Sequence, residues 1–171
     1  MKTATETFLL PCTTDTFWRV FMDEGYVRSL YLDALGSKAF ELLERDASSR
    51  KLRIVPRLSL PAPLTQLIGD AFAYEEHGTL DRSANQWTWR MVQPAGSGGG
   101  GAPKKAIVTT SGTVRVEASG SGQCVRTDRI TLEGKVFGLG GLIEASAEKE
   151  ARSAWAKERV FFTGWLAREP R

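Results

Sequence analysis

Four charged residues in this sequence fall on faces that are otherwise apolar. In the strand-like run QCVRTDRITL, alternation places Arg126 and Asp128 on the same face as Ile130. By the same spacing Glu76 joins the apolar face of FAYEEHGTL, and Glu158 interrupts the inward stripe of the last helix. A buried charge is costly unless it is paired. These groups therefore form either a structural arginine–carboxylate pair or polar anchors for an amphipathic ligand such as a sterol, fatty acid or polyketide. In an enzyme, one carboxyl with a raised pKa would serve as general acid or base.

Residues for other kinds of site chemistry are scarce. His77 is the only histidine, and Cys12 and Cys124 form neither a nucleophile motif nor a CxxC pair. Nucleophilic catalysis by Ser or Cys with His is therefore not expected, and neither is a zinc or other transition-metal site. We assign no catalytic residue, no metal ligand and no cofactor. His77 is expected to be a surface residue with ordinary hydrogen-bond partners.

A glycine-rich turn, VFGLGGLIEAS, precedes the longest predicted helix. Such strand-to-helix turns often cradle phosphates, but this one lacks the third glycine of GxGxxG and the Lys-Ser/Thr of a P-loop. Glu144 is expected in the first helical turn, where its charge would repel an anion. We therefore interpret Gly138, Gly140 and Gly141 as an elbow that reverses the chain, and as a hinge for ligand entry.

Hydrophobic periodicity predicts the elements that position these groups. The expected order is a strand at 3–11, two short helices, about six antiparallel strands from residue 37, and a terminal helix of about seven turns. Strands in an unbroken run, with helices kept apart from them, are typical of α+β proteins. The sequence predicts a curved antiparallel sheet of about six or seven strands, wrapped around the long C-terminal helix.

Length and composition fit one soluble domain spanning 1–171, with 42% hydrophobic residues and a net charge of +3. The glycine-rich segment 94–105 is expected to be a flexible hairpin loop rather than a domain boundary. The small charge surplus gives no reason to expect a nucleic-acid partner. The first apolar stretch is too short for a signal peptide, no run approaches the ~20 apolar residues of a membrane span, and the cysteines show no disulfide pattern. A cytoplasmic protein is expected.

The stronger binding signal is apolar. Trp87, Trp89 and Met91 alternate onto one face, while the inward stripe of the last helix is small in its middle. Small residues facing a curved sheet leave a void unless large wall residues fill it. Either the tryptophans fill this space as a core, or a ligand does. The expected ligand-binding residues are Phe72, Tyr74, Glu76, Trp87, Trp89, Met91, Val114, Val116, Arg126, Asp128, Ile130, Ala147, Ala151, Ala154, Glu158 and Phe161.

The segment RLSLPAPLTQLIGD places Leu60, Leu64 and Leu67 among prolines. These leucines are expected at the entrance of the cavity, as a lid or as a point of transient contact with a membrane surface. A plain cap over the core is an equal alternative.

Two segments carry a family resemblance. The opening FLLPCTTDTFWRVFMDEGYVRSLYLDALG and the tail GLGGLIEASAEKEARSAWAKERVFFTGWL resemble START-like domains, also called the SRPBCC, helix-grip or polyketide-cyclase-like superfamily. The tail is similar to that of an uncharacterised bacterial START-like family, and sterol-binding VASt domains look like looser relatives. The resemblance implies a helix-grip fold and leaves the function open.

We expect a protein that binds, and transports or senses, a small hydrophobic or amphipathic ligand between the last helix and the sheet. The first alternative, which the resemblance permits, is a cyclase/aromatase- or dehydratase-type enzyme acting in the same cavity. The second is a protein-interaction module whose cavity is filled. The oligomeric state is left open.

Overall fold

The computed structural model describes residues 1–68, 72–93 and 106–168, so the glycine-rich segment expected to be a loop lies outside the described residues. The elements, in chain order, are β1 (Lys2–Leu10), α1 (Thr14–Phe21), α2 (Glu24–Ser29), the π-helical turn η1 (Leu30–Ala34), β2 (Ala39–Arg45), β3 (Ser49–Val55), α3 (Ala62–Ile68), β4 (Tyr74–Asp81), β5 (Gln86–Val92), β6 (Val108–Ala118), β7 (Cys124–Gly134) and α4 (Gly140–Leu166).

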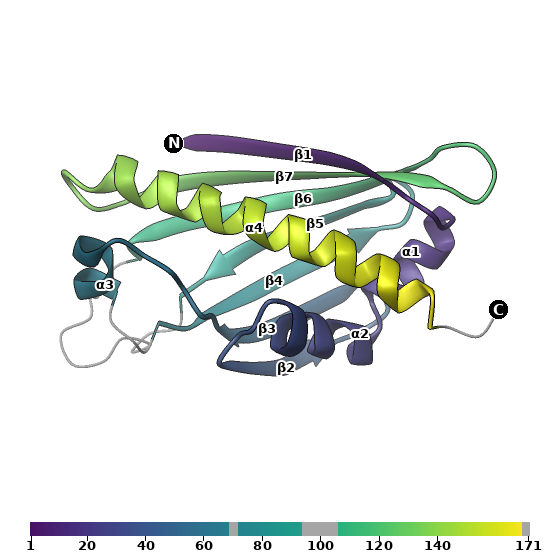
Figure 1. Ribbon diagram of the computed structural model, residues 1–171, viewed down its shortest axis with the longest axis horizontal. Helices are drawn as coiled ribbons and strands as arrows, with labels where there is room; N and C mark the ends of the chain where they lie inside the picture. Colours follow the sequence, from purple (N-terminus) through teal and green to yellow (C-terminus); the bar gives the residue numbers. More distant parts are fainter. Residues whose placement is uncertain (69–71, 94–105, 169–171) are drawn as a thin grey trace.

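All seven strands form one antiparallel sheet in the order β1-β7-β6-β5-β4-β3-β2. Each strand from β2 to β7 pairs with its neighbour in the chain, whereas β1 crosses to pair with β7, from Lys2 opposite Leu132 to Leu10 opposite Cys124. The sheet curves around α4, which runs along its concave side (Figure 1). This arrangement confirms the predicted α+β helix-grip fold, with seven strands.

The short helices begin at capping side chains. The Thr13 hydroxyl accepts a hydrogen bond from the backbone N–H of Thr16 at 3.2 Å, and an Asp23 carboxylate oxygen accepts one from the N–H of Tyr26 at 2.8 Å. Both caps satisfy backbone donors that have no partner inside the helix. The break between the two helices therefore falls at Asp23. The turn η1 continues α2, and α3 forms two turns of helix within the proline-containing segment.

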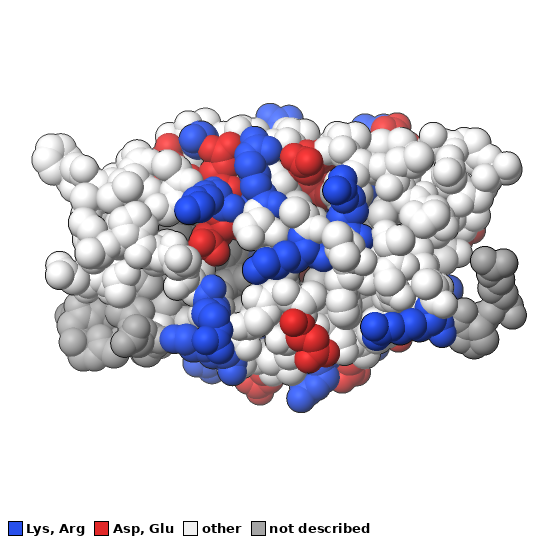
Figure 2. Space-filling model, in the orientation of Figure 1, with Lys and Arg blue, Asp and Glu red and all other residues white. Residues whose placement is uncertain are grey.

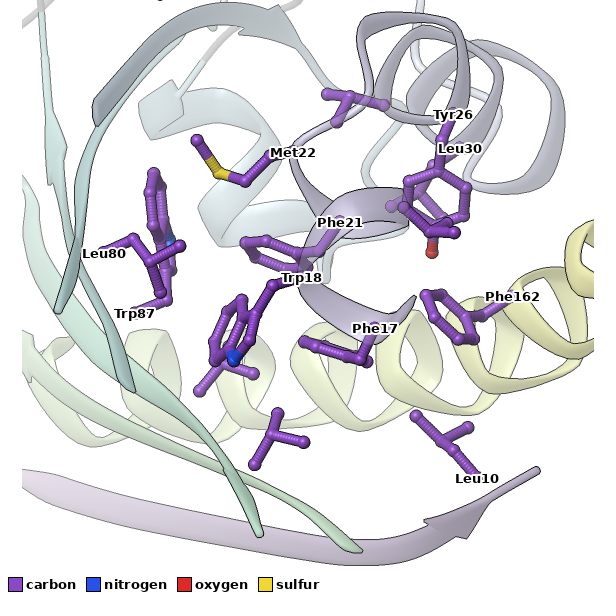
Figure 3. Packing of buried hydrophobic residues seen from close by; sticks show 14 of the residues in the cluster. Leu10, Phe17, Trp18, Phe21, Met22, Tyr26, Leu30, Leu80, Trp87 and Phe162 are labelled. Atoms are coloured by element: carbon purple, nitrogen blue, oxygen red, sulfur yellow. The ribbon is translucent and has the colours of Figure 1, made fainter. Parts of the chain in front are cut away.

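An aromatic cluster fills the end of the molecule where α1 and α2 meet α4 (Figure 3). Phe17 and Trp18 on α1 pack edge to face, with ring centroids 4.9 Å apart. Phe162 on α4 lies 5.2 Å from Phe17 and 5.5 Å from Tyr26 between ring centroids. Burying each of these rings contributes roughly 1.5–3 kcal/mol, so this cluster anchors the C-terminal part of α4.

Two smaller clusters hold the rest of α4. Trp155 packs with Ile130 and Leu132 of β7 and with Ala4 of β1. Nearer the start of the helix, Ile143 packs in a cluster that includes Leu64 of α3, Ile107 and Val108. Within the described part of the chain, no helix is long and apolar enough to span a bilayer.

Candidate functional site

A cavity of about 340 Å³ lies between α4 and the concave face of the sheet. Most residues predicted to bind a ligand line it. The wall includes Phe72, Tyr74, Glu76, Trp87, Trp89, Met91, Val114, Arg126, Asp128, Ile130, Ala147, Ala151, Ala154 and Glu158, together with Leu60 and Leu64 from the predicted entrance. Alternation along the strands and the three-to-four spacing along α4 therefore bring these residues together.

Two of the predicted binding residues lie outside the cavity wall. Val116 has the inward phase of β6 but is fully buried in the aromatic cluster. Phe161 packs against Tyr26 and Trp165, with ring centroids 5.7 and 5.8 Å away. Both side chains face inward, but they lie beyond the end of the cavity, in the closely packed core.

The predicted entrance segment acts mainly as a cap. Leu64 is buried and packs with Ile107 and Ile143, while Leu60 and Leu67 are half-buried against the same cluster. Leu67 does not contribute to the cavity wall.

The glycine elbow spans the turn into α4, whose first two residues are Gly140 and Gly141, and it stands apart from the cavity wall. Gly138 has a φ of +76°, a conformation that disfavours residues with a side chain. A Cβ on Gly134 would come within 2.5 Å of the carbonyl oxygen of Gly140, so the two segments of backbone approach closely here. Gly141 opens the helix beside Gly140. No described contact tests the role of these glycines as a hinge.

Glu144 lies beyond the first turn of α4, which begins at Gly140, so its predicted place in that turn was wrong. Its carboxylate oxygen accepts a hydrogen bond from the backbone N–H of Gly134 at 3.1 Å and pairs with the N-terminal amine of Met1 at 2.9 Å. The residue ties the elbow to β1 and β7.

The two tryptophans of β5 leave the cavity open because each lies over a glycine of a neighbouring strand. A Cβ on Gly78 of β4 would fall 1.9 Å from Cζ2 of Trp87, and one on Gly112 of β6 would fall 2.9 Å from the ring of Trp89. Each indole therefore occupies space that a side chain would otherwise take. The rings cover the sheet instead of filling the space below α4.

A buried ion cluster forms one part of the wall. Arg126 Nε lies 2.8 Å from Asp128 Oδ2, and Arg126 Nη1 lies 2.8 Å from Glu158 Oε1 on α4. Nη2 donates to both carboxylates, again at 2.8 Å. Burial raises the pKa of Asp128 to about 6, against the opposing effect of Arg126. The charges that alternation placed on this inward face are therefore paired.

A second polar cluster contains Arg50, which was not among the predicted site residues. Arg50 Nη1 donates to the carbonyl oxygen of Phe21 at 2.7 Å, and Nη2 lies 3.7 Å from Glu76 Oε1. The Tyr31 hydroxyl donates to Glu76 Oε2 at 3.0 Å. Burial raises the pKa of Glu76, and the Arg50 charge partly offsets that rise. Arg50 lies two positions before the buried Leu52 on β3, so the two side chains share the inward face. This spacing could have predicted Arg50 as a site residue.

The rim of the cavity is charged. Arg57 and Lys157 belong to the wall and are exposed, so they lie where the cavity meets solvent. Figure 2 shows basic and acidic side chains gathered over the middle of the face that α4 crosses.

The remaining reactive side chains lie elsewhere. His77 Nε2 lies 2.8 Å from Glu75 Oε2 and is half-buried. Cys12 and Cys124 are free and buried, with sulfur atoms 3.9 Å apart, because the pairing of β1 with β7 brings them together. Among the described residues, no three His, Cys, Asp or Glu side chains are grouped as metal ligands would be.

The curved sheet and the long terminal helix packed on it define a helix-grip fold. Three solved structures of low sequence identity share this fold. Zhui aromatase/cyclase from Streptomyces sp. R1128 has 16% identity and a TM-score of 0.60, with 92% of this chain and 90% of that one covered. Norcoclaurine synthase from Thalictrum flavum has 16% identity and a TM-score of 0.67 (99% and 89% covered), and TTHA0849 from Thermus thermophilus has 13% and 0.63 (98% and 100% covered).

Residues 5–166 match the family described as "Protein of unknown function (DUF2505)", and the chain belongs to that family. A sequence comparison with curated proteins finds no match.

Proposed function

We propose that the protein binds a small hydrophobic or amphipathic ligand in the cavity below α4 and acts as its carrier or sensor. The observation that carries this proposal is the open volume of about 340 Å³, which the wall tryptophans do not fill. Ligand sites in proteins usually measure ~300–1,000 Å³ and are mostly apolar, with a few polar groups. The structure of norcoclaurine synthase, which has the same fold, is a complex with dopamine and hydroxybenzaldehyde, so a protein of this fold can bind small aromatic molecules.

The alternative of a filled cavity, with the domain acting as an interaction module, loses its premise because this volume is open. We propose that a ligand enters near α3, because Leu60 and Leu64 line the cavity there. Contact of α3 with a membrane surface is a separate proposal. Flotation with vesicles would test it, comparing the protein with a variant in which Leu60 and Leu67 are replaced by Ser.

Native mass spectrometry of the purified protein, followed by extraction of any bound molecule, tests the main proposal. Ala154 faces the cavity and Ala156, two positions along α4, is exposed. We expect a bound molecule with the wild-type protein and with Ala156→Phe, and its loss with Ala154→Phe, whose ring would occupy the cavity. A wild-type protein that carries no small molecule, or equal loss in both variants, would contradict the proposal.

We propose acid–base catalysis on a hydrophobic substrate as the second candidate, because Glu76 combines a raised pKa with a place in the cavity wall. The neighbouring Tyr31 hydroxyl, 3.0 Å away, could relay or hold a proton. An aromatase/cyclase among the similar structures makes a cyclase- or dehydratase-type reaction a reasonable class.

The molecule extracted from the protein, or its close analogues, would serve as substrate in this test. Glu76→Gln should abolish turnover and keep binding. Turnover by Asp128→Asn then tests whether the second carboxyl is also needed. Turnover that is unchanged in both variants would leave the protein as a binding protein.

A further inference from the structure

Two buried hydrogen-bond donors in the cavity wall make no short hydrogen bond, although the Glu158 carboxylate lies beside one of them, the Tyr26 hydroxyl. Among the described residues, five buried polar side-chain atoms make no hydrogen bond. Three of them belong to Arg126 and Asp128, and each lies 2.8 Å from an oppositely charged atom. The other two are the Tyr26 hydroxyl and Arg50 Nε, and both residues line the cavity.

Both groups are held in place by their surroundings. The Tyr26 side chain is fully buried, and its hydroxyl points from α2 toward Phe17 and Phe162 (Figure 3). The guanidinium of Arg50 lies 4.9 Å from the ring centroids of both Phe21 and Trp87. A buried donor without a partner costs about 1–3 kcal/mol. A ligand that carries a hydrogen-bond acceptor would satisfy these donors.

The charges of the buried wall indicate that this acceptor is neutral. Three carboxyl groups, those of Glu76, Asp128 and Glu158, face two guanidinium groups. Both guanidinium groups already have carboxylate neighbours, so a carboxylate or phosphate on the ligand would meet a surplus of negative charge. The basic residues of the rim, Arg57 and Lys157, are exposed to solvent, which screens their charges.

We propose, resting on the function proposed above, that the ligand is an uncharged apolar molecule with a carbonyl or similar oxygen acceptor, held by the Tyr26 hydroxyl and Arg50 Nε. Fatty-acid anions are excluded from this position by the surplus of carboxylates. The apolar part of the ligand lies against Trp87, Trp89 and the alanines of α4.

Three probes of nearly the same shape test the inference: 2-acetylnaphthalene, which has the acceptor; 2-isopropenylnaphthalene, which lacks it; and 2-naphthoate, which is an anion. Calorimetric titration would measure their affinities for the wild-type protein and for Tyr26→Phe. The variant keeps the buried ring and removes a hydroxyl whose polar neighbour, Glu158, keeps its ion pair with Arg126, so it should fold, which thermal unfolding would check. Replacing Arg50 would instead leave Glu76 without its neighbouring charge, so Arg50 is a poorer target.

For the wild-type protein we expect the ketone to bind about tenfold more tightly than the isopropenyl compound, and more tightly than the anion. Tyr26→Phe should weaken binding of the ketone several-fold and change binding of the isopropenyl compound by less than twofold. The difference between the two probes isolates the contribution of the hydroxyl from general packing.

The two proposals fail in different ways. If none of the three probes binds, the cavity is not a ligand site and both proposals fall. If all three bind equally, or if the anion binds most tightly, the cavity remains a ligand site and the neutral-acceptor proposal is overturned. A ketone preference that persists unchanged in Tyr26→Phe overturns the assignment of this donor.

Discussion

Replacing Gly78 by Ala should close part of the cavity by moving a tryptophan. The added Cβ would lie 1.9 Å from Cζ2 and 2.3 Å from Cε2 of Trp87, whereas ordinary contacts are 3.4–4 Å. The atoms it meets belong to a side chain, so the ring can shift, and the cavity is the open side toward which it can move. A displacement of roughly 1.5 Å is needed to restore contact distances.

The energetic effect combines two opposing contributions. Overpacking of this kind costs about 1–3 kcal/mol. The lower conformational freedom of Ala in the unfolded chain returns ~0.5–1 kcal/mol. We therefore expect Gly78→Ala to lower the free energy of unfolding by about 1–2 kcal/mol, and to weaken ligand binding because the displaced ring enters the volume a ligand would occupy.

Urea unfolding and calorimetric titration with 2-acetylnaphthalene would measure the two effects. Gly164→Ala is the matched control, because a Cβ at this position on α4 meets nothing within 4 Å. The control should stabilise the protein by roughly 0.5–1 kcal/mol, as expected for a helix interior, and leave binding unchanged. If Gly78→Ala unfolds and binds like the wild-type protein, the idea that the glycine makes room for the indole is refuted.

Three further predictions concern the buried polar groups. Arg126→Met leaves two buried carboxylates without their cation and should cost about 3–5 kcal/mol in urea unfolding, so a loss below about 1 kcal/mol would contradict the ion cluster. The folded state raises the pKa of Asp128 to about 6, above an unfolded value near 3.9, so it binds more protons between these values. The free energy of unfolding should therefore fall as the pH rises from about 4 to about 6, and Asp128→Asn should flatten this slope. Identical pH profiles for the wild-type protein and Asp128→Asn would contradict the raised pKa of Asp128. Cys12 and Cys124 are buried, so their thiols should react with Ellman's reagent only in urea, and rapid labelling of the native protein would show that this end of the sheet opens.

Alternation predicted the inward faces of the strands because one face of this antiparallel sheet packs against α4 and the aromatic cluster. Glu76, Trp87 and Asp128 lie where the period of two placed them. The same period cannot say how far along a strand the cavity extends, which is why Val116 was expected in the wall and lies in the core. The same alternation could have predicted Arg50, because it shares the inward face of β3 with Leu52.

Other parts of the site depend on packing that no local pattern contains. Tyr26 reaches the cavity only through the angle at which α2 meets α4, and the contact between Cys12 and Cys124 depends on the register of β1 against β7. The position of each indole depends on a glycine in a neighbouring strand. Trp87 lies on β5 and Gly78 on β4, so the pattern of either strand alone does not predict the open cavity.

A few bulky residues hold the helix α4 in place, and small residues between them face the cavity. Ile143, Trp155 and Phe162 are the buried residues of α4 and provide its main contacts with the hydrophobic clusters, and the first two also border the cavity, whereas Ser153 and Ala154 line the open volume without belonging to a cluster. Mutations on the second set of positions can therefore change the size and polarity of the cavity while the first set keeps the domain folded. Ligand preference can thus diverge during evolution faster than architecture, and two members of this family can share every helix and strand without sharing a ligand.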